Sequence, residues 1–215
     1  MKIRFGSIIA IIFFSVAAAS AQFGLSWKHT PIVAVIHSEN DERLGLVDDA
    51  IVFWNKILEE VGSGFRLPKA KRIKQNVPET ELQAFSLSVV GNAGPVEMPK
   101  AFMDLPGDLN IYLARSEFVS FAGPFDQVGK RVVGIRSIKI PPLSFPNVAR
   151  NVIIHEIGHA IGLGHNSDPT MLMCGRPAPC RPALFSSDTP KVFPLTEQEE
   201  SRLRSMYPAD WRSKN

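Results

Sequence analysis

The stretch H-E-I-G-H-A-I-G-L-G-H, from His155 to His165, holds three of the five histidines in this chain of 215 residues. A chance H-E-x-x-H is expected in fewer than about one in a hundred chains of this length, and the added G-x-x-H lowers that frequency roughly another thousandfold. Coincidence is therefore excluded, and the stretch indicates a functional site.

The spacing of the three histidines predicts a metal site. On an α-helix, His155 and His159 lie about 40° apart on one face, so both imidazoles can reach one ion. An unbroken helix would carry His165 about 240° away, so the chain has to turn before it. Gly162 or Gly164 can take the left-handed conformation that such a turn needs. Three imidazoles with an open fourth position are typical of one catalytic zinc ion.

Glu156 lies beside the predicted ligands and is not one of them. Zinc lowers the pKa of bound water to about 7, and a neighbouring carboxylate can take the proton of that water and pass it to a departing amine. The predicted chemistry is hydrolysis, with Glu156 as the catalytic base. The opposite side of the same helix is apolar and is expected to pack into the core through Ile153, Ile154, Ile157, Ala160 and Ile161.

The whole pattern H-E-x-x-H-x-x-G-x-x-H, followed by a methionine, resembles the metzincin zinc metallopeptidases and their matrixin-like members. This resemblance implies that Met173 forms the methionine turn, or Met-turn, below the zinc, with Met171 as the alternative. The sequence departs from the matrixin pattern at Asn166, where serine is usual, and at Cys174, where tyrosine is usual.

The resemblance implies an α+β fold with an N-terminal twisted mixed sheet, two helices over a zinc cleft, and a small irregular C-terminal subdomain. That subdomain would hold the Met-turn and a final helix within 195–208, for which Thr196 and Glu199 make a capping box. The residues alone predict the same order of elements.

Runs of apolar or alternating residues predict the strands of this sheet, and a three- and four-residue apolar spacing predicts a helix over 47–61 that stops at Gly62. The predicted strands lie at 31–38, 84–90, 109–114 and 131–140. We expect the strand at 131–140 to be the sheet edge to which an extended substrate adds.

The N-terminus has the features of a signal peptide. A basic start is followed by the apolar run Ile8–Ala19 and by the small residues Ala19, Ser20 and Ala21 before Gln22. We expect cleavage after residue 21, export to the periplasm or the medium, and a single catalytic domain over 22–215. An uncleaved anchor is the alternative, but the run falls short of the ~20 residues of a spanning helix.

The charge of the chain excludes nucleic acid as an expected partner. The formal net charge is +3, and removal of Lys2 and Arg4 with the leader brings it to +1 (3 − 2). The basic run at 69–74 has no interleaved aromatic residues and is predicted to be a solvated strand or loop. No later segment is long and apolar enough to suggest a membrane contact after cleavage.

The two cysteines predict one disulfide. Cys174 and Cys180 enclose the turn-forming sequence G-R-P-A-P, and an exported chain is expected to oxidise such a pair. A zinc-bound Cys174 thiolate is the competing interpretation, but a fourth ligand would close the catalytic site.

These observations together predict an exported zinc-dependent endopeptidase that acts on peptide or protein substrates as a monomer. Two alternatives remain: a catalytically silent zinc-binding interaction domain, and a zinc amidase acting on cell-wall peptides. The scattered acidic residues leave calcium binding undecided. Little room lies between Gln22 and the strand at 31–38 for an inhibitory propeptide, so the enzyme is either active from synthesis or restrained by a separate protein inhibitor.

Overall fold

The computed structural model of this chain describes residues 25–38, 41–91, 96–124, 129–139, 141–175, 180 and 189–214, so the predicted leader lies outside the described residues. A five-stranded sheet with the strand order β2-β1-β3-β5-β4 forms the centre. The strands are β1 (Val33–His37), β2 (Lys71–Lys74), β3 (Leu109–Leu113), β4 (Phe121–Gly123) and β5 (Arg131–Ile135). β4 runs antiparallel to β5, and the other pairings are parallel, so the sheet is mixed as expected.

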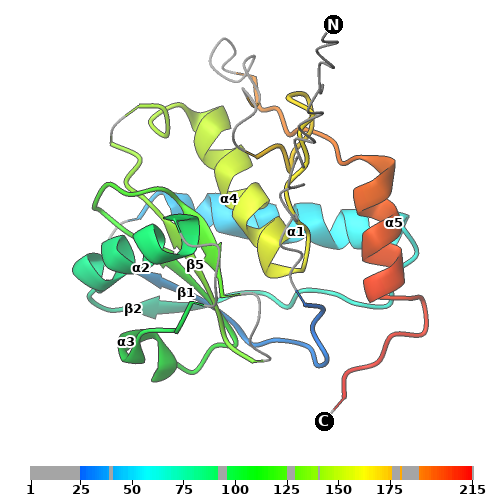
Figure 1. Ribbon diagram of the computed structural model, residues 1–215, viewed down its shortest axis with the longest axis horizontal. Helices are drawn as coiled ribbons and strands as arrows, with labels where there is room; N and C mark the ends of the chain where they lie inside the picture. The colour runs from blue at the N-terminus through cyan, green and yellow to red at the C-terminus, as the bar shows by residue number, and fades with distance from the viewer. Residues whose placement is uncertain are drawn as a thin grey trace, which may run out of the picture.

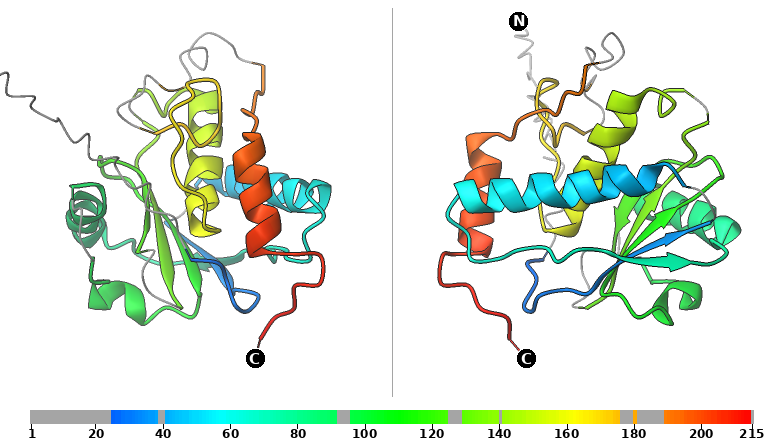
Figure 2. Two further views of the ribbon diagram at one scale, coloured as in Figure 1. Left: turned by 45° about the vertical axis from the view of Figure 1, so that its right-hand side comes forward. Right: turned by 180° about the vertical axis from the view of Figure 1, so that it is seen from behind.

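Helices cover both faces of this sheet (Figures 1 and 2). On one face lie the long helix α1 (Arg43–Glu60) and the helix of the histidine motif, α4 (Pro146–Ala160). On the other face lie α2 (Glu79–Gly91) and the short α3 (Lys100–Met103). The last helix, α5 (Glu197–Met206), contacts the turn that follows α4, where Arg202 Nε donates to Gly162 C=O. This arrangement confirms the predicted α+β class.

Two hydrophobic cores follow from the alternation of side chains along each strand. Val33 and Val35 of β1 point into the core beneath α1 and α4, which we call the metal-side core. Ala34 and Ile36 point into the opposite core beneath α2 and α3, which we call the outer core. Because both faces are covered, every residue of β1, β3 and β5 is buried.

The prediction of a strand at 84–90 is wrong, since these residues lie within α2. Apolar and small residues alternate there as in a strand, but Leu82, Phe85 and Ser86 are buried together at helical spacing. Leu82 N–H donates to Pro78 C=O, so the helix is already formed before the alternating stretch begins. Tertiary packing on the outer core therefore overrides the local pattern.

The prediction that 131–140 forms the sheet edge is also wrong. β5 ends at Ile135 and lies between β3 and β4, so its backbone is paired on both sides. After Ile135 the chain leaves the sheet, since Ser137 N–H donates to Ser116 C=O. On this side the sheet ends at β4, and on the other side it ends at β2. β4 has only three residues, which is too short for an alternating pattern to be recognised in the sequence.

The remaining predicted elements are confirmed. β1 and β3 fall within the predicted ranges, and α1 extends the predicted helix at its start and ends before Gly62, whose φ is +73°. The basic run at 69–74 contains the exposed strand β2. Within the described residues, no helix combines the length and the apolar composition that a membrane span requires.

Candidate metal centre

Helix α4 carries two of the three histidines on a buried scaffold. Pro146 occupies its first turn, where a missing N–H costs nothing, and the predicted apolar residues are buried, with Ile153 and Ile157 fully enclosed. The helix ends in a turn in which Gly162 has φ +105° and Leu163 N–H donates to Gly158 C=O over 3.0 Å. Of the two glycines expected to allow the turn, Gly162 takes the left-handed conformation.

The turn brings His165 back to His155 and His159, so the three imidazoles converge. The Nε2 atoms lie 3.0 Å apart for His155 and His159, 2.9 Å for His159 and His165, and 3.3 Å for His155 and His165. Nitrogen ligands about 2.0–2.1 Å from a tetrahedral zinc ion are separated by roughly 3.3 Å. The donor set and its spacing therefore fit a zinc ion, and the group could hold a metal.

Backbone carbonyls orient the two helical histidines. His155 Nδ1 lies 2.9 Å from Leu172 C=O, and His159 Nδ1 lies 2.8 Å from Leu163 C=O. A carbonyl accepts only, so each Nδ1 carries the proton and each Nε2 keeps its lone pair for a metal. Sequence reasoning missed both partners, because any residue supplies a backbone carbonyl.

His165 is held by the chain that follows it. Asn166 N–H donates to Met173 C=O over 2.9 Å, and Gly175 N–H donates to Asn166 C=O over 3.0 Å. The His165 ring lies against Gly175 so closely that a Cβ there would be 2.2 Å from the ring Cγ. Only glycine fits this position. The isolated β-bridge between Asn166 and Cys174 therefore holds the chain on either side of the third imidazole.

Met173 lies under α4. It is fully buried, and a Cβ on Gly158 would be 2.7 Å from its sulfur. Met171, the alternative from the sequence, is half-buried. The thioether of Met173 thus packs against the helix between its two histidines.

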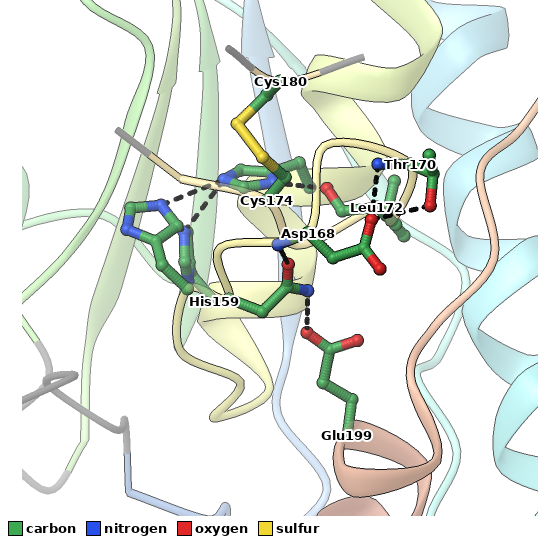
Figure 3. The surroundings of a disulfide bond; sticks show 10 residues. His159, Asp168, Thr170, Leu172, Cys174, Cys180 and Glu199 are labelled. Carbon is green, nitrogen blue, oxygen red and sulfur yellow. Dashed lines mark hydrogen bonds between the residues drawn. A yellow bond between two sulfur atoms is a disulfide. The ribbon is translucent and has the colours of Figure 1, made fainter. Parts of the chain in front are cut away.

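Asn166 connects this site to α5 (Figure 3). Its Nδ2 donates to Glu199 Oε1 over 2.6 Å, while Glu199 Oε2 accepts from Thr196 N–H in the predicted capping box. The carboxylate of Asp168 accepts from the backbone and the hydroxyl of Thr170, and these bonds lower its pKa. The Asn166–Glu199 contact was not predicted, since nothing in the sequence relates residues 33 positions apart.

The structure contains the expected disulfide between Cys174 and Cys180, with an S–S distance of 2.07 Å. Cys174 directly follows Met173, so the crosslink lies in the chain beside the histidines (Figure 3). Both sulfurs are engaged with each other, which argues against a thiolate ligand to the metal.

Glu156 is buried, with 7% of its surface exposed, although it is a carboxylic acid. It follows His155 directly on α4, and helix geometry places it roughly 60° from His159. The acid is therefore positioned next to the converging imidazoles and is not among the group that could hold a metal.

Comparison with known proteins bears on the same residues. Residues 96–192, just under half of the chain, match the Matrixin family. No curated protein matches the chain. A similar solved structure is archaemetzincin from Methanopyrus kandleri, 18% identical, which covers 81% of this chain and 95% of its own with a TM-score of 0.40. The resemblance expected from the motif is thus confirmed over residues 96–192, and the family match supports a zinc metallopeptidase in general.

Proposed function

We propose that this chain is an exported zinc endopeptidase whose zinc is held by His155, His159 and His165. The convergence of three Nε2 atoms within 3.3 Å of one another carries this proposal. Zinc bound there would polarise the substrate carbonyl. It would also lower the pKa of water, so that hydroxide is available to attack the carbonyl at neutral pH.

Glu156 supplies the proton transfers in this proposal. Its carboxylate accepts the proton of the attacking water and then donates it to the nitrogen of the departing amine. Its position supports the role, since the buried side chain follows His155 on α4 and lies beside the converging imidazoles. An interaction domain without activity would have no use for such an acid.

Met173 is the methionine of the proposed Met-turn. Its buried sulfur against Gly158 supports this choice over Met171. From that position it supports the helix that carries two of the ligands, without contributing a ligand itself.

The substrate binds extended along β4. This strand forms one edge of the sheet and contacts α4, so a peptide paired with it passes close to the histidines. Backbone pairing holds a peptide whatever its sequence, which suits protein substrates.

Export and processing complete the proposal. The leader at 1–21 is removed, and residues 22–215 act as one catalytic domain. The Cys174–Cys180 disulfide supports an oxidising compartment, because cytosolic thiols of this kind stay reduced.

The test compares wild type with Glu156→Gln on a mixed peptide library, with cleaved bonds identified by mass spectrometry. Glutamine keeps the size of the side chain but cannot accept the proton, so zinc content should be unchanged while the rate falls by about 10² or more. Glu59→Gln, on the exposed side of α1, is the control and should cut like wild type. If zinc-loaded wild type cuts neither peptides nor unfolded protein, the peptidase assignment is wrong, and purified cell-wall peptide becomes the next substrate to assay.

A further inference from the structure

The turn that ends α4 has an unusual set of hydrogen-bond partners. A helix leaves its last carbonyls without partners in the helix, and water or side chains have to satisfy them. Here the last carbonyl of α4, that of Ala160, and the three turn carbonyls that follow it, up to Leu163, all lie against donors from side chains. Those donors are Trp27 Nε1 at 3.0 Å and Arg131 Nη1 for Ala160, Tyr207 Oη at 2.9 Å for Ile161, Arg202 Nε at 3.2 Å for Gly162, and His159 Nδ1 at 2.8 Å for Leu163.

Three of these donors also hold one another. Trp27 N–H donates to Tyr207 Oη over 3.1 Å, and the Arg131 guanidinium lies 4.2 Å above the Trp27 ring. Arg131 Nη2 also donates to Leu25 C=O, so the chain before β1 is fastened to the start of β5. We call Trp27, Arg131 and Tyr207 the turn anchor.

Arg131 is the charged member of the turn anchor. Its side chain is 2% exposed, and no carboxylate within the described ranges lies at ion-pair distance from it. Its charge faces the C-terminal end of α4, where the helix dipole is negative. Burial raises the pKa of Tyr207 to about 12, and its hydroxyl donates to Ile161 C=O.

The turn anchor acts at the point where the third imidazole leaves the helix. His155 and His159 are placed by α4 itself, whereas His165 comes after the anchored carbonyls and is exposed. A shift of the turn would therefore move His165 directly. It would reach His159 through Leu163 C=O, which lies 2.8 Å from His159 Nδ1, whereas His155 Nδ1 contacts Leu172 C=O, which is outside the turn.

We propose that Trp27, Arg131 and Tyr207 are positioning residues that set the place of His165 and so the zinc affinity of the site. The inference rests on the proposed zinc site. Through Trp27, the segment before β1 would affect zinc binding, although 133 residues separate Trp27 from Ala160 at the end of α4.

Two substitutions test the proposal by zinc affinity, measured by competition with a coloured chelator at a temperature where each variant is folded. Arg131→Lys keeps the charge but cannot bind two carbonyls and stack on Trp27 together. Tyr207→Phe removes one hydroxyl and keeps the ring stacked on Phe65, whose centroid is 4.3 Å away. We expect each to lower zinc affinity about tenfold or more, as loss of a residue that orients a ligand does.

Arg43→Lys is the matched control. Arg43 is also a buried arginine that binds two backbone carbonyls, those of Ile135 and Arg136, but it does not contact the turn. It should lower the melting temperature and leave zinc affinity within about twofold of wild type. Unchanged affinity in both Arg131→Lys and Tyr207→Phe, or an equal loss in Arg43→Lys, would overturn the proposal.

The route through His165 is tested with cobalt(II) in place of zinc. At saturating cobalt, the visible absorption of Arg131→Lys should differ from that of wild type, because the ligand geometry at His165 changes. Weaker binding with a wild-type spectrum would show that the turn anchor does not act through the ligand. No substrate is used, so a chain that binds zinc and cuts nothing refutes the proposed function without touching this inference.

Discussion

The two faces of the sheet are built by different means. On the metal-side face, indole and amide groups reach backbone carbonyls, as Trp54 does to Ile154 at 2.9 Å and Asn151 to Lys191 at 2.7 Å. The outer core is a cluster of rings, in which Phe102 packs 5.5 Å from Phe85 and 5.1 Å from Tyr112. The Tyr112 hydroxyl is buried there without a partner in the described chain, and burial raises its pKa. On the metal-side face these bonds tie side chains to the backbone around the histidines, whereas the centre of the outer core is held by ring packing.

The largest effect should come from the metal-side face. Replacing His165 by Ala removes one of the three proposed ligands and should abolish both tight zinc binding and cleavage. Metal content after dialysis and a peptide assay measure the two. His37→Ala, which alters a histidine outside the group, is the control. Full zinc occupancy in His165→Ala would refute the three-ligand site.

A cavity in the outer core should separate stability from metal binding. Phe102 is fully buried, so Phe102→Ala should lower the free energy of unfolding by about 3–5 kcal/mol. Zinc affinity of the folded fraction should not change, because the sheet lies between this core and α4. Chemical denaturation and chelator competition measure the two quantities. A parallel loss of both would mean that the two faces are not independent.

Removal of the disulfide should have a smaller effect on stability. The crosslink closes a loop of only six residues in sequence separation, so replacing both cysteines by Ala should cost about 2 kcal/mol. Because Cys174 follows Met173, the crosslink shapes the chain beside the proposed zinc site. We therefore expect the double variant to cut the peptide library at different preferred sites. Denaturation curves and library digests of the double variant test this. Finding two free thiols in exported wild type by mass spectrometry would contradict the crosslink.

The smallest expected effect concerns the start of α5. It separates the role of Glu199 in capping this helix from its role in holding Asn166 beside the histidines. Thr196→Ala removes only the cap and should cost about 1 kcal/mol with zinc affinity intact. Glu199→Gln should cost a similar amount and also weaken zinc binding, since one oxygen cannot serve both Thr196 N–H and Asn166 Nδ2. Equal zinc affinities in the two variants would limit Glu199 to the cap. Thermal melts and chelator competition provide the comparison.

Features that depend on neighbouring residues could be predicted from the sequence, and features that join distant residues could not. The metal-side motif is local, because the spacing from His155 to His165 alone predicts a helix, a glycine turn and three converging imidazoles. The turn anchor is not local, since Trp27 meets Tyr207 across 180 residues and Ala160 across 133. No spacing rule connects such positions, so only the fold reveals them.

On the outer face, the same limit produced an error. The stretch at 84–90 alternates like a strand but lies in α2, and Glu79 at the start of this helix accepts from the backbone N–H groups of Arg115 and Ser116. Ser86 likewise donates to Val119 C=O. These contacts come from a loop that the sequence does not place, so local alternation was the wrong guide.

The far edge of the sheet has a consequence for how copies of the chain behave in concentrated solution. β2 lies at the end opposite β4, and its exposed side chains Lys71, Arg72 and Lys74 are all basic. β2 pairs with β1 on one side, and its outer edge invites another chain to add to it. Its basic side chains on both copies oppose that growth, with the charge of Arg72 partly offset by its ion pair with Asp48. At about 1 M salt the Debye length falls to about 3 Å, and this protection weakens. Light scattering should therefore detect aggregation first in high salt, through the edge at β2.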